Sequence, residues 1–331
     1  MGSGSGSGSG SDPPVDAPGV VDDPGLDGAP FSLADSSCIA AADRITCQDV
    51  VYSVVGTTSL HLDLIAPPTA TAGPVPTIVY LHPGGWSVGS YHQLAQFRLA
   101  TYLARGYAVV SVEYRLTLAP DHSVSGIVFP DDLADVKTAV RWLRIKGAGF
   151  VDPDRILVYG VSAGAHLGAL IATTPDVAAF DGRGDPHVST SVRAFLGLST
   201  PISFHWFVPE NPPLADTCPS QPPGQDPQQG VSWLLGGDLD DPAYTDELTA
   251  ISPVTYFGAT TPPMLLFAGT CDQTVPYQET VEAGSGAQAL GLSQIQTVIV
   301  PDAFHGTTLD PPSSQAAADA FIFAQLDGQA P

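Results

Sequence analysis

Positive charge is scarce in this sequence of 331 residues, where 11 Lys and Arg stand against 34 Asp and Glu for a formal net charge of -23. A field of this sign repels phosphate backbones and anionic membrane surfaces, so we expect no nucleic-acid partner. Long apolar runs are also missing: none approaches the roughly 20 residues that cross a bilayer, and we expect no membrane span. Cys and His never cluster at the spacing of a zinc site, so we expect no bound metal.

The four cysteines allow three disulfide pairings, and their even number favours structural disulfides. We rank Cys38 with Cys47 first and Cys218 with Cys271 second, with four reduced, buried thiols as the alternative. Disulfides favour a secreted or periplasmic protein over a cytoplasmic one, because they persist in oxidising compartments. No signal peptide opens the chain, but Met1–Ser11 is a Gly-Ser repeat typical of an added linker, so this absence excludes neither location.

Composition separates the first 30 residues from the rest of the chain. Residues 12–30 consist largely of Asp, Pro and Gly and cannot bury enough apolar surface to offset the entropy of ordering, so we expect 1–30 to form a linker and a disordered tail. The chain as a whole is 44% hydrophobic and 14% charged, which indicates a globular fold. We interpret residues 31–331 as one domain.

Short apolar runs of the buried-strand type recur from residue 50 onward. Val50–Val55 and Leu60–Ile65 predict an antiparallel hairpin with its turn near Gly56 and Thr57. Six further runs are Thr77–Leu81, Ala108–Tyr114, Ile156–Gly160, Phe195–Leu198, Met264–Gly269 and Ile295–Val300. Amphipathic segments separate most of them, most clearly Pro130–Lys146. This alternation predicts an α/β fold with a mostly parallel eight-stranded sheet, an antiparallel N-terminal hairpin and helices on both faces.

A long segment, residues 199–255, separates two of these strands and is rich in Pro, Asp and aromatic residues. It exceeds a usual crossover connection, so we predict a short cap insertion. Ligands of open α/β sheets bind beyond the carboxyl ends of the strands, which places the insertion over that site. The alternative is a simple surface excursion.

The most informative motif is Gly160-Val161-Ser162-Ala163-Gly164, between a predicted buried strand and a helical segment. A serine here sits on a sharp turn that needs small neighbours, because a Cβ at either glycine would collide with nearby backbone. The pattern predicts that Ser162 is a nucleophile, with a structural Ser-Gly turn as the alternative.

A serine nucleophile needs a base, and the base needs an anion that fixes its tautomer. Asp272 and His305 each follow the end of a predicted strand, and the order Ser162, Asp272, His305 is the one expected of this fold. Asp302 is a rival acid, but it lies too close along the chain to reach the ring from a separate strand end. The alternatives are a helix cap for Asp272 and a solvated loop residue for His305.

Amide donors for a tetrahedral oxyanion are expected in the segment His82-Pro83-Gly84-Gly85, which follows a buried strand. Pro83 has no N–H, so donation falls to Gly84 and Gly85, together with the amide of Ala163 after the nucleophile. We interpret His82 as structural. A tight Pro-Gly-Gly turn without a catalytic role is the alternative.

Aromatic residues near these motifs are candidates for substrate binding. Trp86 lies beside the oxyanion glycines, and Phe204, Trp206 and Phe207 open the insertion, where they could wall an acyl or aryl pocket. Ordinary core packing is the alternative for all four. His166, behind the serine, is interpreted as a packed or capping residue rather than a second base.

Seven segments carry a resemblance to a known family: HPGGW, VEYRL, DPDRILVYGVSAGAHL, LLGG, ISPVTYF, PPMLLFAGTCDQTVP and VPDAFHG. Over about Asp49–Leu326 the chain is similar to the α/β-hydrolase esterases of the hormone-sensitive-lipase-like and feruloyl/acetyl-xylan esterase groups. The resemblance implies the α/β-hydrolase fold and a serine carboxylesterase without a cofactor, whose nucleophile, acid and base fall on Ser162, Asp272 and His305. Pro83 replaces the usual first glycine of the oxyanion motif, Cys271 stands beside the acid and the loop after Tyr114-Arg115 is longer than in the family.

The sequence thus predicts hydrolysis of carboxylic esters. Neutral esters are the expected substrates, since the negative field of the protein disfavours substrates that bear a carboxylate. Short-chain, acetyl, aryl or feruloyl esters and polyesters all fit this class. A serine peptidase of the same fold is one alternative, and a hydrolase-shaped binding module without chemistry is another. No feature predicts an oligomeric state.

Overall fold

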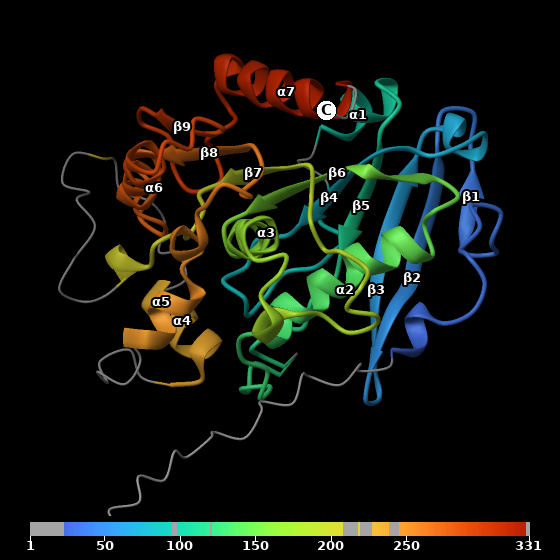
Figure 1. Ribbon diagram of the computed structural model, residues 1–331, viewed down its shortest axis with the longest axis horizontal. Helices are drawn as coiled ribbons and strands as arrows, with labels where there is room; N and C mark the ends of the chain where they lie inside the picture. The colour runs from blue at the N-terminus through green and yellow to red at the C-terminus, as the bar shows by residue number, and fades with distance from the viewer. Residues whose placement is uncertain are drawn as a thin grey trace, which may run out of the picture.

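The computed structural model describes residues 23–94, 98–119, 121–207, 218, 227–237 and 245–328, which form a sheet flanked by helices (Figure 1). The strands are β1 (Cys38–Ala40), β2 (Ile45–Val55), β3 (Thr58–Ala66), β4 (Val75–Leu81), β5 (Ala108–Val112), β6 (Val151–Val161), β7 (Ala194–Leu198), β8 (Met264–Gly269) and β9 (Ile295–Val300). The α-helices are α1 (Leu99–Ala104), α2 (Asp131–Ile145), α3 (Ala163–Thr173), α4 (Pro227–Leu235), α5 (Thr245–Ile251), α6 (Tyr277–Ala289) and α7 (Pro312–Leu326). Short 3₁₀ helices are η1 (Pro24–Leu26), η2 (Pro68–Thr71), η3 (Ala178–Phe180), η4 (His205–Phe207) and η6 (Pro253–Tyr256).

The described strands form a nine-stranded sheet in the order β1-β2-β3-β5-β4-β6-β7-β8-β9. Pairings from β1 to β5 through β2 and β3 are antiparallel, and those from β5 to β9 are parallel. The α/β-hydrolase prediction is confirmed, but the predicted count of eight strands is wrong by one. The additional strand is β1, whose three residues are too few for an alternating pattern to reveal.

The inner strands are buried on both faces, as their continuous apolar runs predict. In β4, Ile78 and Tyr80 pack with residues of α1 and α7 on one face, whereas Val79 and Leu81 pack with residues of α2 and α3 on the other. The two helical layers lie on opposite sides of the sheet in Figure 1. The edge strand β9 is an exception, because its central residues are partly exposed.

Local signals in the sequence place the hairpin and the longest predicted helix well. The turn between β2 and β3 falls at Gly56 and Thr57, as predicted. Helix α2 spans Asp131–Ile145 against the predicted Pro130–Lys146, with Asp131 and Asp132 in its positive first turn and Arg144 in its last.

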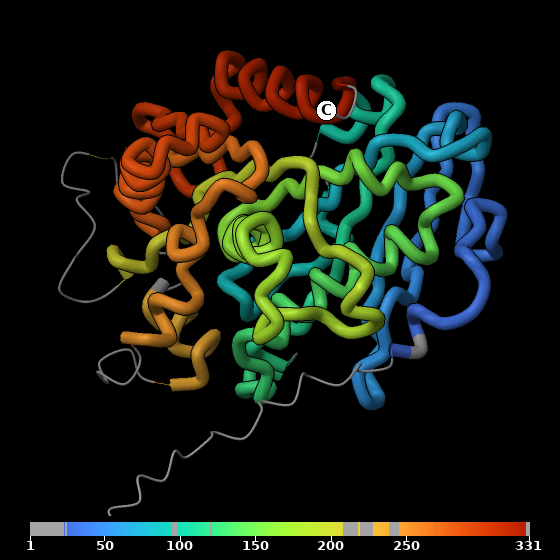
Figure 2. Tube along the Cα trace, in the orientation of Figure 1, coloured from blue at the N-terminus to red at the C-terminus, as the bar shows by residue number. Residues whose placement is uncertain are grey.

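The predicted insertion leaves the carboxyl end of β7 and returns to β8, which pairs with β7 in parallel. Its described parts include η4, α4, α5 and η6, which gather beside α6 (Figures 1 and 2). The parallel strands β4, β6, β8 and β9 end at the same edge of the sheet, and each is followed by one of the predicted site segments.

The predicted boundary at residue 30 needs correction, because Asp23, Gly25 and Leu26 pack against the domain, whereas residues 27–30 are exposed. Asp23 is buried, and its carboxylate accepts hydrogen bonds from the Ser53 hydroxyl and the Val54 amide and pairs with Arg183. Composition predicts a tail here because the segment has few apolar residues. Ion pairing with a residue 160 positions along the chain instead holds it in place.

Among the described residues, no helix combines the length and the apolar content needed to cross a lipid bilayer.

Candidate active site

Ser162 occupies a strained turn between β6 and α3. Its φ of 53° and ψ of -121° are unusual for a residue with a side chain. A Cβ on Gly160 would lie 2.4 Å from the Gly164 carbonyl oxygen, and one on Gly164 would lie 2.3 Å from the Leu81 carbonyl oxygen. Both glycines of the motif are therefore required by close backbone approach, as the sequence predicts.

Asp272 and His305 come together beyond the ends of β8 and β9. The Nδ1 atom of His305 lies 3.0 and 2.9 Å from the two carboxylate oxygens of Asp272. The carboxylate of Asp272 is buried, and its Oδ1 also accepts the amides of Thr274 at 2.9 Å and Val275 at 2.8 Å. These amides belong to the loop before α6, whose N-cap is Pro276 without a side-chain cap bond, so Asp272 is not the helix cap considered as an alternative. Because Nδ1 donates to the carboxylate, Nε2 of His305 is left to accept a proton.

The rival acid Asp302 does not pair with His305. The Asp302 side chain is exposed, and the Asp302 amide donates to the Thr270 hydroxyl at 2.8 Å, whereas Nδ1 of His305 pairs with Asp272. The preference for Asp272 as the partner of His305 is therefore supported by the geometry.

Ser162 and His305 line the same cavity, whose volume is about 440 Å³. Within the described part of the chain, the Ser162 hydroxyl forms no hydrogen bond to the ring of His305. Such contacts are often long before substrate binds. The cavity is lined by Pro83, Gly84, Gly85, Trp86, Val88, Gly89, Gln93, Ser162, Pro201, Phe207, Gly230, Thr274, Val275 and His305.

Gly84 and Gly85, in the segment after β4, line this cavity. Gly84 and Gly85 have φ values of 137° and 54°, and the amides of Ser87 and Val88 close a turn onto the Gly84 carbonyl at 3.1 and 3.0 Å. Among the described residues, the amides of Gly84, Gly85 and Ala163 have no hydrogen-bond acceptor. The tight turn therefore coexists with unsatisfied amides; Gly84 and Gly85 line the cavity, whereas Ala163 is not among its lining residues.

His82 anchors the start of this segment, in line with its predicted structural role. Burial lowers the pKa of His82 to about 4, so the ring is neutral. Its Nδ1 donates to the Pro83 carbonyl at 2.8 Å, and the ring stacks on Tyr114 with centroids 4.3 Å apart. The Tyr114 hydroxyl donates to the His82 carbonyl at 2.8 Å.

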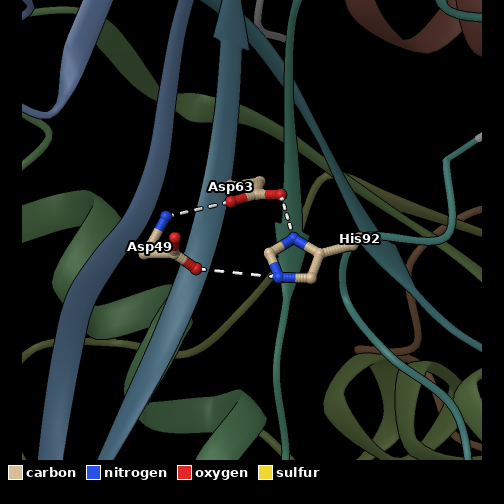
Figure 3. A group of neighbouring side chains, drawn as sticks. All are labelled: Asp49, Asp63 and His92. Atoms are coloured by element: carbon tan, nitrogen blue, oxygen red, sulfur yellow. Dashed lines mark hydrogen bonds and ion pairs between the residues drawn. The ribbon is translucent and has the colours of Figure 1, made fainter.

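A polar cluster anchors the far end of the segment to the sheet, and Figure 3 shows its three side chains. His92 places Nδ1 2.7 Å from Asp63 and Nε2 3.7 Å from Asp49, while the Tyr91 hydroxyl donates to Asp49 at 2.6 Å. The ligating atoms of Asp49, Asp63 and His92 lie within 4.8 Å of one another, close enough to hold a cation. Their mutual hydrogen bonds already account for the arrangement. No pattern in the sequence connects these residues.

His166 is fully buried between the nucleophile helix and the insertion, and burial lowers its pKa to about 4. Its Nδ1 accepts the indole N–H of Trp86 at 3.1 Å, and its Nε2 donates to the Ile251 carbonyl at 2.8 Å. Both ring nitrogens are engaged, so the residue is packed and is not a second base, as interpreted from the sequence.

Two of the four aromatic residues predicted at the substrate line the cavity, namely Trp86 and Phe207. The prediction for Phe204 is corrected, because this residue is buried and does not line the cavity. Its ring centroid lies 6.1 Å from that of Trp86 and 5.2 Å from that of Phe207. The prediction for Trp206 is also corrected, since Trp206 does not line the cavity and its ring centroid lies 5.6 Å from that of His205. Adjacent positions of a short 3₁₀ turn point in different directions, which composition cannot resolve.

Both predicted disulfides, Cys38–Cys47 and Cys218–Cys271, are present. The first joins directly opposed residues of β1 and β2. The second joins the insertion to the residue before Asp272. It therefore ties the insertion to the loop that holds the carboxylate.

The sheet order and the strained serine beyond β6 place this chain in the class of α/β-hydrolases. The BD-FAE family model matches residues 62–285, and the chain belongs to this family. Curated relatives from Mycobacterium tuberculosis include Esterase LipC, 27% identical over 240 residues, covering 71% of this chain and 54% of the relative. Carboxylesterase NlhH is 35% identical over 130 residues, 39% of this chain and 38% of the relative. The chain spans about half the length, or less, of these curated relatives.

Solved structures agree on the fold. Thermogutta terrifontis esterase 2, phosphonylated by sarin, is 25% identical with a TM-score of 0.66, covering 84% of this chain and 95% of that one. A truncated carbohydrate esterase from gut microbiota is 20% identical with a TM-score of 0.68, covering 91% of this chain and 100% of that one. The second likeness supports the fold alone.

Proposed function

We propose that this protein is a serine carboxylesterase that acts through an acyl-enzyme intermediate, with residues 31–331 and the segment from Asp23 as its catalytic domain. The observation that carries the proposal is the pairing of His305 with the buried Asp272 carboxylate at the edge of a cavity that Ser162 also lines. The names of the relatives LipC and NlhH, an esterase and a carboxylesterase, support it.

In the proposed reaction, the Ser162 oxygen attacks the ester carbonyl carbon while Nε2 of His305 takes the hydroxyl proton. Asp272 holds the ring through Nδ1 and stabilises the imidazolium. The carbonyl oxygen becomes an oxyanion. As the carbon–oxygen bond to the alcohol breaks, His305 returns the proton to the leaving alcohol. Water then repeats these steps on the acyl-enzyme and releases the acid.

The amides of Gly84, Gly85 and Ala163 are proposed to hold the oxyanion. Their lack of an internal acceptor supports this assignment, since donors that are already oriented need no rearrangement in the transition state. Pro83 cannot contribute because it has no N–H.

Neutral esters are the proposed substrates. Apart from His305, no described residue that lines the cavity is titratable, so nothing there compensates a substrate carboxylate. Trp86 and Phe207 supply apolar walls for an acyl or aryl group. Structures of the Thermogutta esterase were solved with propionate and with butyrate bound, which supports short acyl chains. The two disulfides support a secreted or periplasmic location.

Labelling with a fluorophosphonate tests the nucleophile. The wild-type protein and the control Ser189→Ala, changed at an exposed serine, should carry one adduct on Ser162 and hydrolyse p-nitrophenyl acetate. Ser162→Ala should lose the adduct and about 1,000-fold or more in kcat. A folded wild-type protein without an adduct would instead identify a binding module.

A further inference from the structure

Glu279 is a fully buried carboxylate on α6 that has no charged partner among the described residues. Its Oε2 accepts the amides of Ile202, Ser203 and Phe204 at 3.0, 2.6 and 3.0 Å. Its Oε1 accepts the amide of Trp206 at 3.1 Å. Burial raises the pKa of Glu279, and the four amides oppose that rise. One side chain thus binds the backbone of a whole turn.

The turn held by Glu279 forms one wall of the cavity. Pro201 and Phe207, at its two ends, line the cavity directly. Between them, Phe204 has a φ of 53° and packs against Trp86. A non-glycine residue with positive φ is costly unless its surroundings impose it, and the Phe204 amide is one of the four that Glu279 accepts.

Helix α6 also connects this wall to the proposed acid. The segment from Asp272 continues through Thr274 and Val275, which line the cavity, directly into α6. Glu279 lies in the first turn of that helix, where its own amide donates to Pro276. The carboxylate therefore fixes the wall relative to the part of the chain that orients His305.

We propose that Glu279 is a positioning residue for substrate selection: by holding the turn from Pro201 to Phe207, it sets how long an apolar group the ester can place against that wall. This inference rests on the proposed esterase function. Glu279 does not touch the reacting atoms, so its removal changes selection among esters and leaves the chemistry of the smallest ester intact.

Glu282 offers a matched control one turn further along α6. It is partly exposed, and it contacts the same turn from outside through the Ser203 hydroxyl at 3.3 Å and His205 at 3.4 Å. Glu279→Gln and Glu282→Gln each remove one negative charge from the same helix. Only the first replaces a buried acceptor oxygen with an NH2 group, which cannot accept the amides of the turn.

The experiment measures kcat and KM for p-nitrophenyl acetate, butyrate and hexanoate. Glu279→Gln should raise KM for the longer esters about tenfold, as expected when a hydrophobic pocket no longer fits, while kcat for the acetate stays within about twofold. Glu282→Gln should match wild type on all three. Glu279→Asp keeps the charge but is one methylene shorter, so its KM for the longer esters should lie between those of wild type and Glu279→Gln. If Glu279→Gln does not fold, Glu279→Asp serves as the test variant.

The two possible failures are separable. If Ser162→Ala still hydrolyses the esters, the proposed function is wrong. If Ser162→Ala is inactive and folded Glu279 variants discriminate among chain lengths as wild type does, only the role of Glu279 is overturned. A uniform fall in kcat for all three esters also overturns it, because that pattern indicates damage to the catalytic residues.

Discussion

The two walls of the proposed active-site cavity are built in different ways. The wall that follows β4 combines the Trp86 side chain with glycine backbone, whose unusual φ values accompany unsatisfied amides. The wall from the insertion consists of side chains, Pro201, Phe207 and the helix bearing Gly230, and it is held from behind by buried polar groups. The first wall suits a step common to all esters, whereas the second suits selection among them.

The largest expected effect breaks the backbone wall. In Gly84→Ala, the new Cβ would lie 1.8 Å from the Val88 carbonyl oxygen at a φ of 137°, so the turn must shift. We expect kcat for p-nitrophenyl acetate to fall about 100-fold or more, the typical effect of losing one oxyanion donor, with little change in KM. Gly286→Ala on α6 has open space and should remain active. Equal activities of the two variants would remove Gly84 from the proposed site.

His166 joins the wall that follows β4 to the insertion, through Trp86 and Ile251, and its buried ring predicts a pH dependence of stability. Its folded pKa is about 4 against an ordinary value of 6.5. Between these values the unfolded chain binds a proton that the folded protein does not. The stability contributed above pH 6.5 is therefore lost as pH falls toward 4, by up to about 3 kcal/mol.

His166→Gln removes that titration, so urea unfolding of both proteins should show their stability difference shrinking from pH 6.5 to 4. Asp132, whose pKa burial raises to about 7, changes stability in the opposite direction, but it is present in both proteins and cancels. Parallel stability curves would contradict the buried, neutral ring.

A substitution at Gly230 would narrow the cavity from the side of the insertion alone. A Cβ there would meet the Gly85 carbonyl oxygen at 3.6 Å and the Trp86 ring at 3.7 Å, which is ordinary contact. Gly230→Leu should therefore fold and lower kcat/KM for p-nitrophenyl hexanoate about tenfold while sparing the acetate. Gln229→Leu, exposed on the same helix, serves as the control. A loss for acetate as large as that for hexanoate would mean that both walls serve the chemistry.

The smallest effect concerns charge, which both walls lack. Because the net charge of -23 lies elsewhere on the protein, its repulsion of a carboxylate-bearing ester is screened by salt. Raising the salt concentration from about 10 mM to 0.5 M should increase kcat/KM for such an ester about threefold and leave a neutral ester of equal length unchanged. The comparison requires only the wild-type protein. Equal salt dependence of kcat/KM for the two esters would contradict the idea that the net negative charge repels the carboxylate-bearing ester.

The contrast between the walls also explains what could be predicted from the sequence. Strand-end positions and a glycine pattern suffice to locate Ser162, Asp272 and His305 in one region and to select Gly84 and Gly85 as candidate donors, because these are local signals on a regular sheet. Glu279 could not be found this way. Its partners lie more than 70 positions away, and a glutamate on a helix is usually a solvated residue.

The same limit applies to Phe204 and Trp206. Their identity as aromatic residues in the insertion predicts an apolar wall, but which of them faces the cavity depends on the direction of a short turn. That direction is determined by amides bound to a distant side chain. Likewise β1 depends on a disulfide and on its single neighbouring strand, β2, rather than on its own three residues.

The ion pair between Asp23 and Arg183 carries a practical consequence for anyone who shortens the protein. Cutting before residue 23 preserves the pair, whereas a chain that starts at residue 31 leaves Arg183 with Asp135 as its remaining acidic partner in a poorly hydrated place. Two truncations only eight residues apart should thus differ sharply in expression yield and melting temperature, although both leave the domain from Cys38 onward intact.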